Sequence, residues 1–258
     1  MDTPAIRTAL AVLTALPLTL LTACGDSGSD SGSGSGSGSA SGPGRADGSG
    51  TRAMTSAPSG PLSARELEKR SLGKREVKGF FISEPGTSMV VTEDQVGTDR
   101  KQCRPLGLAL SSVAMGNPAA TAQRWAVAEV NAHSSPDAPA SVVMITLASY
   151  DDAEGARAAL TRLKKAVTAC PDGFTGTQQE AESRFTKITE DTSPRVGDDP
   201  LGFTATLEED GGTAPMKAFV FRGGSTLAYF SAVDFGTLDG SDFTFPVALA
   251  KAQEKKLR

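Results

Sequence analysis

The chain has 258 residues and a formal net charge of −4, and 5% of its residues are aromatic. Nucleic-acid binding is disfavoured, because phosphate contacts need clustered Lys and Arg, and base stacking needs aromatic side chains. Residues 61–258 provide enough chain for one compact domain with its own hydrophobic core.

The first 23 residues are typical of a signal peptide. Arg7 and the free amino terminus supply a positive end, and the apolar run Ala9–Leu21 follows. This run contains Pro17 and is shorter than the roughly 20 residues that a bilayer-spanning helix needs. We therefore expect residues 1–23 to be a targeting segment and not a membrane span.

The segment Leu21-Thr22-Ala23-Cys24 resembles a bacterial lipobox. The resemblance implies cleavage before Cys24 and attachment of a diacylglyceryl group, with acyl chains such as palmitate, to its thiol. Two acyl chains hold a protein firmly at a membrane. We therefore expect a lipoprotein on the extracellular face of the cell membrane. The alternative is an ordinary signal peptide with an incidental cysteine.

Residues 24–60 are expected to form a disordered tether. Residues 25–60 contain 11 Gly and 11 Ser and very few apolar side chains, so they cannot build a core. A flexible chain of this length has a root-mean-square reach of about 30–35 Å. Such a tether would hold the following domain away from the membrane.

Cys103 and Cys170 remain as an even pair once Cys24 carries lipid. In an oxidising compartment this favours a disulfide bond, which would close a loop of about 70 residues. Two free thiols or a metal site are the alternatives. Zinc is disfavoured because the chain has one histidine, His133, and no CxxC pattern.

The first half of the folded region shows short helices and strands. Ser63 and Glu66 form a capping-box pattern at the start of a short helix that runs to about Leu72. We expect further elements in chain order: a first strand at 77–83, a second extended strand segment at 88–94, a helix at 103–116, a strand at 122–133, and a central strand at 140–150 that is buried on both faces.

The second half begins with a long helix. Its apolar stripe consists of Ala153, Ala156, Leu160, Leu163 and Val167. Strands are expected at 174–179, 182–190, 202–208, 215–222 and 225–234, followed by a helix that Asp242 or Thr244 caps. Short connections favour antiparallel pairing, so we predict one α+β domain over residues 61–258. It should have a largely antiparallel sheet, about four helices and one long central helix.

Sequence patterns of common catalytic sites are absent from the chain. It has no GxSxG motif, no HExxH motif and no phosphate-binding loop. A catalytic triad would need His133, which lies beside a polar turn and is typical of an exposed loop histidine. The pairs Asp151-Asp152 and Asp198-Asp199 are interpreted as helix capping and a turn. We expect no catalysis, no cofactor and no bound metal.

Several short motifs follow one another in a distinctive order. They are Pro61-Leu62 through Leu67, Val77-Lys78-Gly79-Phe80, an apolar helix from Cys103 to Met115, the strand VVMITL, the helix start Tyr150-Asp151-Asp152-Ala153, and Cys170 at that helix's end. In this order residues 61–258 resemble the extracellular sensor domain of mycobacterial serine/threonine kinases of the PknH type, and free-standing lipoproteins similar to it. The family usually has two disulfides, whereas this chain has cysteines for one.

The resemblance implies a cleft for an unidentified ligand. We expect a monomeric, non-catalytic, lipid-anchored surface protein that binds a small ligand or a partner in the cell envelope. The alternative is a carrier for lipids or hydrophobic molecules, which would need a hollow between the sheet and the long helix. An enzyme that uses His133 and acidic turns is a third hypothesis.

Overall fold

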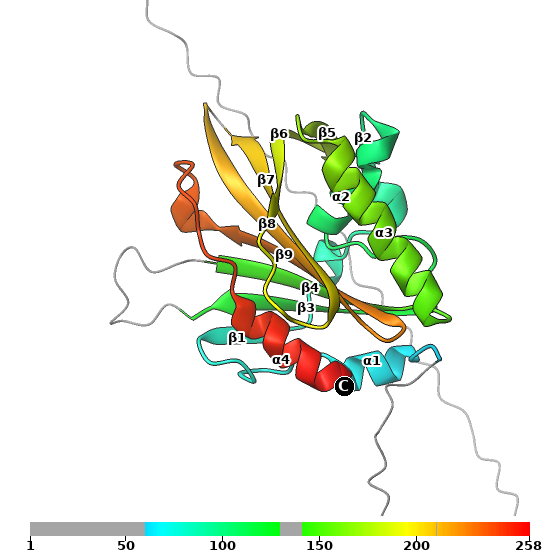
Figure 1. Cartoon of the computed structure of the whole chain (residues 1–258). Helices are drawn as coiled ribbons and strands as arrows, with labels where there is room; N and C mark the ends of the chain where they lie inside the picture. Colours follow the sequence, from blue (N-terminus) through cyan, green and yellow to red (C-terminus); the bar gives the residue numbers. More distant parts are fainter. Residues whose placement is uncertain (1–59, 130–140, 210) are drawn as a thin grey trace, which may run out of the picture. The chain divides into compact units, whose positions relative to one another are not determined.

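A computed structural model describes residues 60–129, 141–209 and 211–258 of the chain (Figure 1). The expected signal peptide, Cys24, His133 and the tether up to residue 59 lie outside these described residues. The described part is an α+β domain in which four α-helices pack on an antiparallel sheet, as the sequence predicted.

The helices and strands follow the predicted order closely. The α-helices are α1 (Ala64–Arg70), α2 (Arg104–Leu110), α3 (Ala153–Ala169) and α4 (Val247–Leu257). The strands are β1 (Phe80–Ser83), β2 (Val96–Thr98), β3 (Ala120–Ala128), β4 (Ser141–Ser149), β5 (Phe174–Gln178), β6 (Ala181–Asp191), β7 (Asp198–Glu209), β8 (Gly212–Gly223) and β9 (Thr226–Asp234).

The nine described strands form one sheet in the order β1-β3-β4-β9-β8-β7-β6-β5-β2. All neighbouring pairs are antiparallel, and β5 to β9 form the predicted meander. Tight turns permit this arrangement, and Gly224 between β8 and β9 has a φ of 61°, which glycine adopts without strain. β1 and β2 lie at opposite edges although few residues separate them in sequence.

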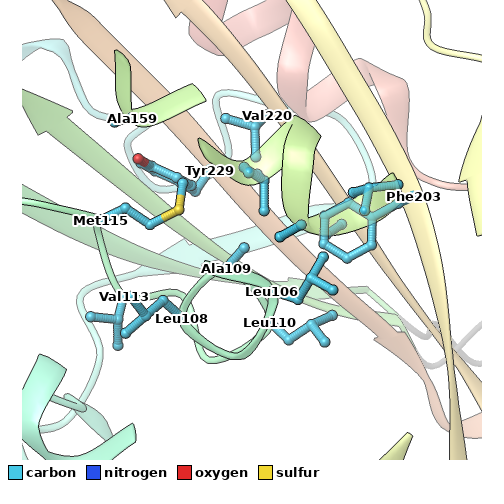
Figure 2. Close-up of a cluster of buried hydrophobic side chains, with 14 of the residues drawn as sticks. Leu106, Leu108, Ala109, Leu110, Val113, Met115, Ala159, Phe203, Val220 and Tyr229 are labelled. Atoms are coloured by element: carbon cyan, nitrogen blue, oxygen red, sulfur yellow. The ribbon is translucent and has the colours of Figure 1, made fainter. Parts of the chain in front are cut away.

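Helices cover both faces of the sheet, so the domain has two hydrophobic cores (Figure 1). Alternating residues of β9 divide between them: Leu227 and Tyr229 face the core beneath α2 and α3, and Phe230 faces the core beneath α1 and α4. Figure 2 shows side chains of α2, among them Leu106 and Leu110, with sheet residues of the first core. The predicted burial of β4 on both faces is also confirmed.

The predicted disulfide joins Cys103 to Cys170, and both residues are fully buried. Cys103 lies at the start of α2 and Cys170 at the end of α3, so the bond connects the two helices of one layer. At the other end of α3, the side chain of Asp152 accepts a hydrogen bond from the Gly155 amide at 2.8 Å. This is the capping role that the sequence predicted.

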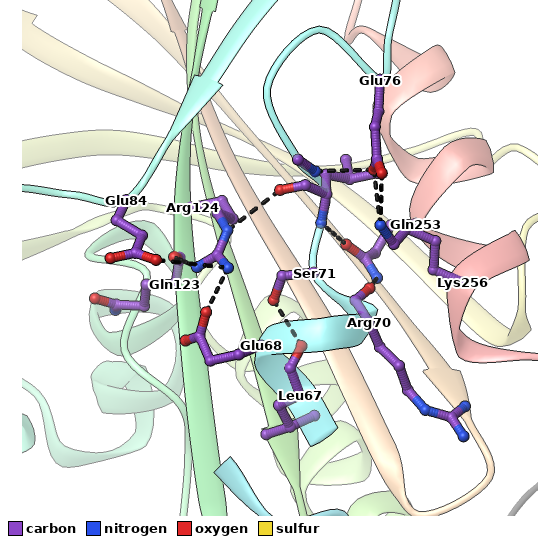
Figure 3. Close-up of polar contacts among 12 residues, drawn as sticks. Leu67, Glu68, Arg70, Ser71, Glu76, Glu84, Gln123, Arg124, Gln253 and Lys256 are labelled. Atoms are coloured by element: carbon purple, nitrogen blue, oxygen red, sulfur yellow. Dashed lines mark hydrogen bonds and ion pairs between the residues drawn. The ribbon is translucent and has the colours of Figure 1, made fainter. Parts of the chain in front are cut away.

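α1 and α4 contact each other on the opposite face. The Ser63–Glu66 capping box is present in α1. The buried side chain of Gln253 in α4 accepts from the Leu72 amide at 3.2 Å and donates to the Arg70 carbonyl at 2.7 Å (Figure 3). Arg70 is the last residue of α1, and Leu72 follows the helix. Gln253 therefore holds α4 against α1.

Residues 88–94 are not a strand, contrary to the sequence prediction. They contain parts of two short 3-10 helices, η1 (Thr87–Met89) and η2 (Glu93–Gln95), and Met89 and Val90 are exposed. A β-rich run becomes a strand only where a neighbouring edge pairs with it. Here the chain crosses from one edge of the sheet to the other. The short strand β2 at the end of this crossing was not predicted.

Two helix ends also differ from the prediction. The helix expected over 103–116 ends at Leu110, because Ser112 adopts a left-handed conformation with a φ of 54°. Neither Asp242 nor Thr244 caps α4. The residue at its N-cap is Pro246, with no side-chain hydrogen bond, and Asp242 instead pairs with Lys217 at 2.9 Å.

Candidate functional site

A cleft of about 470 Å³ lies beside the first half of β3. Thr121–Arg124 of β3 line it as four consecutive residues, together with Thr146 of β4. One wall comes from residues 84–93, and another from residues 113–118, which follow α2. We call this site the β3 cleft. Its volume is in the range of about 300–1,000 Å³ that is common for ligand sites.

The cleft exists because β1 is much shorter than β3. β1 ends at Ser83, and Pro85 follows it. Proline has no N–H and cannot donate to a strand ladder, so it favours the end of a strand. Beyond Ser83 the chain leaves β3 and forms the wall at residues 84–93.

Arg124 is the central charged side chain of the cleft, and it is 11% exposed. Its Nε donates to the Leu72 carbonyl at 3.2 Å, and its Nη1 donates to the Gln123 carbonyl at 2.7 Å. Nη2 forms an ion pair with Glu68 and lies 3.9 Å from Glu84 (Figure 3). These partners hold the guanidinium in one orientation.

Hydroxyl and amide groups fix the wall that follows α2. Thr146 Oγ1 donates to the Ser112 carbonyl at 2.7 Å, and Gln123 Nε2 donates to the same carbonyl at 3.0 Å. Ser231 Oγ donates to the Leu110 carbonyl at 2.7 Å. Carbonyls at the end of a helix lack partners within the helix, and the sheet supplies them here.

A pair of buried tyrosines also supports the wall formed by the segment after α2. Tyr150 Oη donates to the Met115 carbonyl at 2.8 Å and lies 2.9 Å from Tyr229 Oη. Burial raises the pKa of Tyr150 to about 12 and raises the pKa of Tyr229 well above 10, because the charged phenolate would be poorly solvated. Both phenols therefore stay neutral at physiological pH and act as structural hydrogen-bonding groups.

The rim of the cleft is acidic and its walls are partly apolar. Glu68, Glu84 and Glu93 contribute three carboxylates, against the single guanidinium of Arg124 among the lining residues. Val90, Val91, Val113, Ala114 and two prolines supply apolar surface. No histidine or cysteine is among the described lining residues. The groups that are present offer charge, hydrogen bonds and apolar contact to a ligand.

The acidic pairs that the sequence singled out have structural partners away from the cleft. Asp152 caps α3, Asp198 pairs with Arg222 at 3.2 Å, and Asp199 pairs with Lys164 at 2.5 Å. Cys24 and His133 lie outside the described residues. The sequence analysis did not single out Arg124, Gln123 or Glu68. The only available signal was two adjacent polar residues inside an otherwise alternating strand.

The described residues contain no group of three or more His, Cys, Asp or Glu side chains that could hold a metal ion. None of the described helices is both long enough and apolar enough to cross a membrane.

A second, apolar cavity of about 240 Å³ lies beside α2 and the β5–β8 part of the sheet. Its lining includes Leu110, Phe185, Leu207 and Met216. The space between α3 and the sheet is filled, since Ala159, Leu160 and Leu163 of α3 are at most 2% exposed. The hollow expected for a carrier is therefore not located under the long helix.

The fold and the cleft define an α+β domain whose antiparallel sheet has helices on both faces and an open cleft at one strand edge. The family model described as PknH-like extracellular domain matches residues 62–237. The chain therefore belongs to the PknH-like extracellular domain family. α4 lies beyond the matched residues.

A solved structure shows the same relationship at the level of the fold. The crystal structure of the extracellular domain of PknH from Mycobacterium tuberculosis has a TM-score of 0.51 and 16% sequence identity, covering 76% of this chain and 97% of that chain. An X-ray structure of an uncharacterised Mycobacterium smegmatis protein has a TM-score of 0.34 and 12% identity, covering 75% and 95%. The second score is too low to support an argument. Comparison with curated proteins found no match.

Proposed function

We propose that this chain is a lipid-anchored, monomeric cell-surface protein whose domain binds a small ligand or an envelope partner, without catalysis, in the β3 cleft. The observation that carries the proposal is the cleft itself, with the fixed guanidinium of Arg124 on its floor and apolar walls around it. Preformed concave sites with few, well-placed polar groups are typical of ligand binding.

The extracellular family description agrees with the lipobox-like segment Leu21–Cys24. In the proposed organisation residues 1–23 are removed, Cys24 carries the lipid, residues 24–60 act as tether, and residues 61–258 form the binding domain. The whole chain would then sit on the extracellular face of the cell membrane.

The anchor is tested by Cys24→Ala in the full-length protein. We expect the variant to appear in the soluble fraction or to remain unprocessed, because the acylated thiol is missing. Cys103→Ala with Cys170→Ala is the matched control and should keep membrane association. Unchanged membrane retention and lipid labelling of Cys24→Ala would contradict the proposed anchor.

Ligand binding is tested by native purification followed by mass spectrometry of co-purifying molecules. Thr121→Trp fills the β3 cleft, and Thr186→Trp places the same side chain on an exposed position of β6. We expect a bound molecule with the wild-type protein and with Thr186→Trp, and its loss from Thr121→Trp. Equal recovery from both variants would place the ligand elsewhere and would argue against the β3 cleft.

A carrier of lipids or hydrophobic molecules is the second candidate, and the apolar cavity beside α2 is the observation that favours it. The cavity of about 240 Å³ is smaller than most ligand sites. A carrier would release acyl chains or other apolar molecules in the same mass spectrometry, and Thr121→Trp would not remove them.

A further inference from the structure

β1 covers only part of β3. It pairs with residues 125–128, from Ser83 opposite Trp125 to Phe80 opposite Ala128. Among the described strands, none lies beside residues 120–124 on that side, and β4 is their neighbour on the other. This length of β3 edge faces the β3 cleft. Uncovered sheet edges present backbone N–H and C=O groups that another extended chain can pair with.

The direction of these backbone groups follows from the observed hydrogen bonds. Alternate residues of an antiparallel strand direct their N–H and C=O to opposite neighbours. The Glu129 amide donates to the Gly79 carbonyl on the β1 side at 2.8 Å. Gln123 and Thr121 precede Glu129 by an even number of residues, so their N–H and C=O groups point to the same side as those of Glu129. This side faces the cleft.

One of these four groups already has a partner, because the Gln123 carbonyl accepts from Arg124 Nη1. The N–H and C=O of Thr121 and the N–H of Gln123 have no hydrogen-bond partner among the described residues. Arg124 thus marks the boundary between the part of the edge that β1 occupies and the part that is open.

We propose that the β3 cleft binds an extended peptide segment as an added strand, antiparallel to β3 and in line with β1. The proposal rests on the proposed binding function and names the occupant of the same cleft. Donor and acceptor groups that alternate along a strand match those of another extended peptide. At about 3.3 Å per residue, the five residues 120–124 accommodate a peptide of similar length.

The charge of the rim specifies the peptide further. The side chains of Glu68, Glu84 and Glu93 are 44%, 76% and 46% exposed to solvent. Glu68 and Glu84 lie beside the largely buried guanidinium of Arg124, and Glu93 lies 3.7 Å from Arg104. Three carboxylates thus share two guanidinium groups, and the rim keeps a net negative charge. A peptide with a Lys or Arg side chain is therefore complementary to the site, and an acidic peptide is repelled.

A second uncovered edge, on β6, lacks these features. β5 pairs only with residues 181–185 of β6, and beyond them the Ile188 amide already donates to the Pro171 carbonyl at 3.0 Å. Lys187 is exposed on this edge, and charged edge residues discourage strand pairing. The β3 edge is the better candidate because it combines free groups with a cleft.

The test is amide hydrogen exchange of the full-length protein with the peptide acetyl-Thr-Val-Lys-Val-Thr-amide. We expect the Thr121 and Gln123 amides to exchange about tenfold more slowly at saturating peptide, because both become hydrogen-bonded. A peptide with Glu in place of Lys should bind more weakly, and the difference should shrink as salt is added.

N-methylated peptides provide the sharper control. Methylation at both Val amides blocks one edge of the peptide, and methylation at the Lys amide blocks the other edge. Strand addition requires that one of these peptides protects Thr121 and Gln123 and that the other does not. Equal protection by both peptides, or no protection by the parent peptide, would overturn the proposal.

Two variants of the protein test the same proposal. Thr121→Pro removes the N–H that faces the cleft and leaves the hydrogen bonds with β4 intact, whereas Thr121→Ala keeps that N–H. Peptide protection at Gln123 should be lost in the first variant and kept in the second, with exchange of the Ile145 amide reporting that β4 is folded. If a small molecule is displaced by Thr121→Trp but the peptide protects nothing, strand addition fails and the proposed binding function stands.

Discussion

Arg124 connects β3 with α1 and the residues that follow it, which lie more than 50 positions earlier in the sequence. It bonds to Glu68 in α1, to the Leu72 carbonyl after α1, and to the Gln123 carbonyl in its own strand. A guanidinium has five N–H donors in a rigid plane, so it can serve several acceptors at once. Lysine, with one ammonium group, could not reproduce this geometry.

Replacing Arg124 by methionine should destabilise the domain. Arg124→Met leaves the Leu72 carbonyl without its donor in a part-buried site, and we expect the free energy of unfolding to fall by about 1–3 kcal/mol. Urea unfolding measures this change. Glu84→Gln is the control, with an expected change within about 0.5 kcal/mol, because that carboxylate is 76% exposed. An Arg124→Met variant as stable as wild type would contradict the structural role.

Tyr150 and Tyr229 are the two tyrosines of the chain, and their phenols form one buried hydrogen-bonded pair. Burial raises the pKa of Tyr150 to about 12 and that of Tyr229 well above 10. A tyrosine in the unfolded chain titrates near pH 10. Because the folded pKa is the higher one, the stabilising contribution is complete below pH 10 and is lost as the pH rises toward 12.

A tyrosinate absorbance titration measures this pH dependence with no other tyrosine contributing. We expect little tyrosinate in the folded protein until the pH exceeds 11, and a loss of about 2–3 kcal/mol of stability between pH 10 and 12 from Tyr150. Tyr150→Phe should reduce this slope of stability with pH. Ordinary titration of both tyrosines near pH 10 in a folded protein would show that the pair is not buried.

The layer made by α2 and α3 depends on a covalent connection as well as on packing. α2 has seven residues, so it is too short to be stable alone in water. Its side chains Leu106, Leu108 and Leu110 are buried, and the disulfide joins its N-cap residue to the C-cap residue of α3. The apolar contacts and the disulfide therefore stabilise α2 together.

Removal of the disulfide by Cys103→Ala with Cys170→Ala should lower the free energy of unfolding by about 2–5 kcal/mol. The cysteines are 67 residues apart, so the bond restricts a large part of the unfolded chain. Denaturant unfolding with and without reductant measures the effect. Reductant should leave the double variant unchanged, and a wild-type protein insensitive to reductant would contradict the prediction.

Elements with a strong local pattern were predicted well from sequence. α3 has its apolar stripe and its Asp152 cap, and β4 is a continuous apolar run. Residues 88–94 have a similar β-rich composition, yet they find no pairing edge and form short 3-10 helices instead. Pairing depends on residues distant in sequence, and a local pattern does not contain that information.

The β3 cleft could not be predicted from these patterns. Its residues come from α1, from the segment after β1, from the segment after α2, and from β3. The contacts of Arg124 with Glu68 and Leu72 connect residues 56 and 52 positions apart. The open edge of β3 also depends on where β1 ends, which is a property of the sheet and not of β3.

At the scale of the whole molecule, the crossing between β1 and β2 organises the domain. The chain leaves one edge of the sheet after Ser83 and reaches the opposite edge at Val96. On its way it forms a wall of the β3 cleft, and its residue Val91 packs in the core beneath α2 and α3. One segment thus forms part of the cleft and connects the two edge strands of the sheet.

Deletion of residues 25–52 should leave the stability of the domain unchanged within about 0.5 kcal/mol. Ala40, Pro43 and Ala46 are the only apolar side chains that the deletion removes, so little apolar burial can be lost. The measurement is the urea midpoint of the deleted and complete proteins. A clear loss of stability would mean that this segment packs on the domain and is not a simple tether.

The sequence by itself determined the fold class, the order of most elements and the cysteine pair, and it predicts an anchor at Cys24. These features depend on composition, local periodicity and cysteine number, which are readable along the chain. Only the tertiary structure decided the strand order, the site of the cleft and the role of Arg124. Each of these depends on which distant segments meet, and strand pairing and burial settle that only when the whole chain folds.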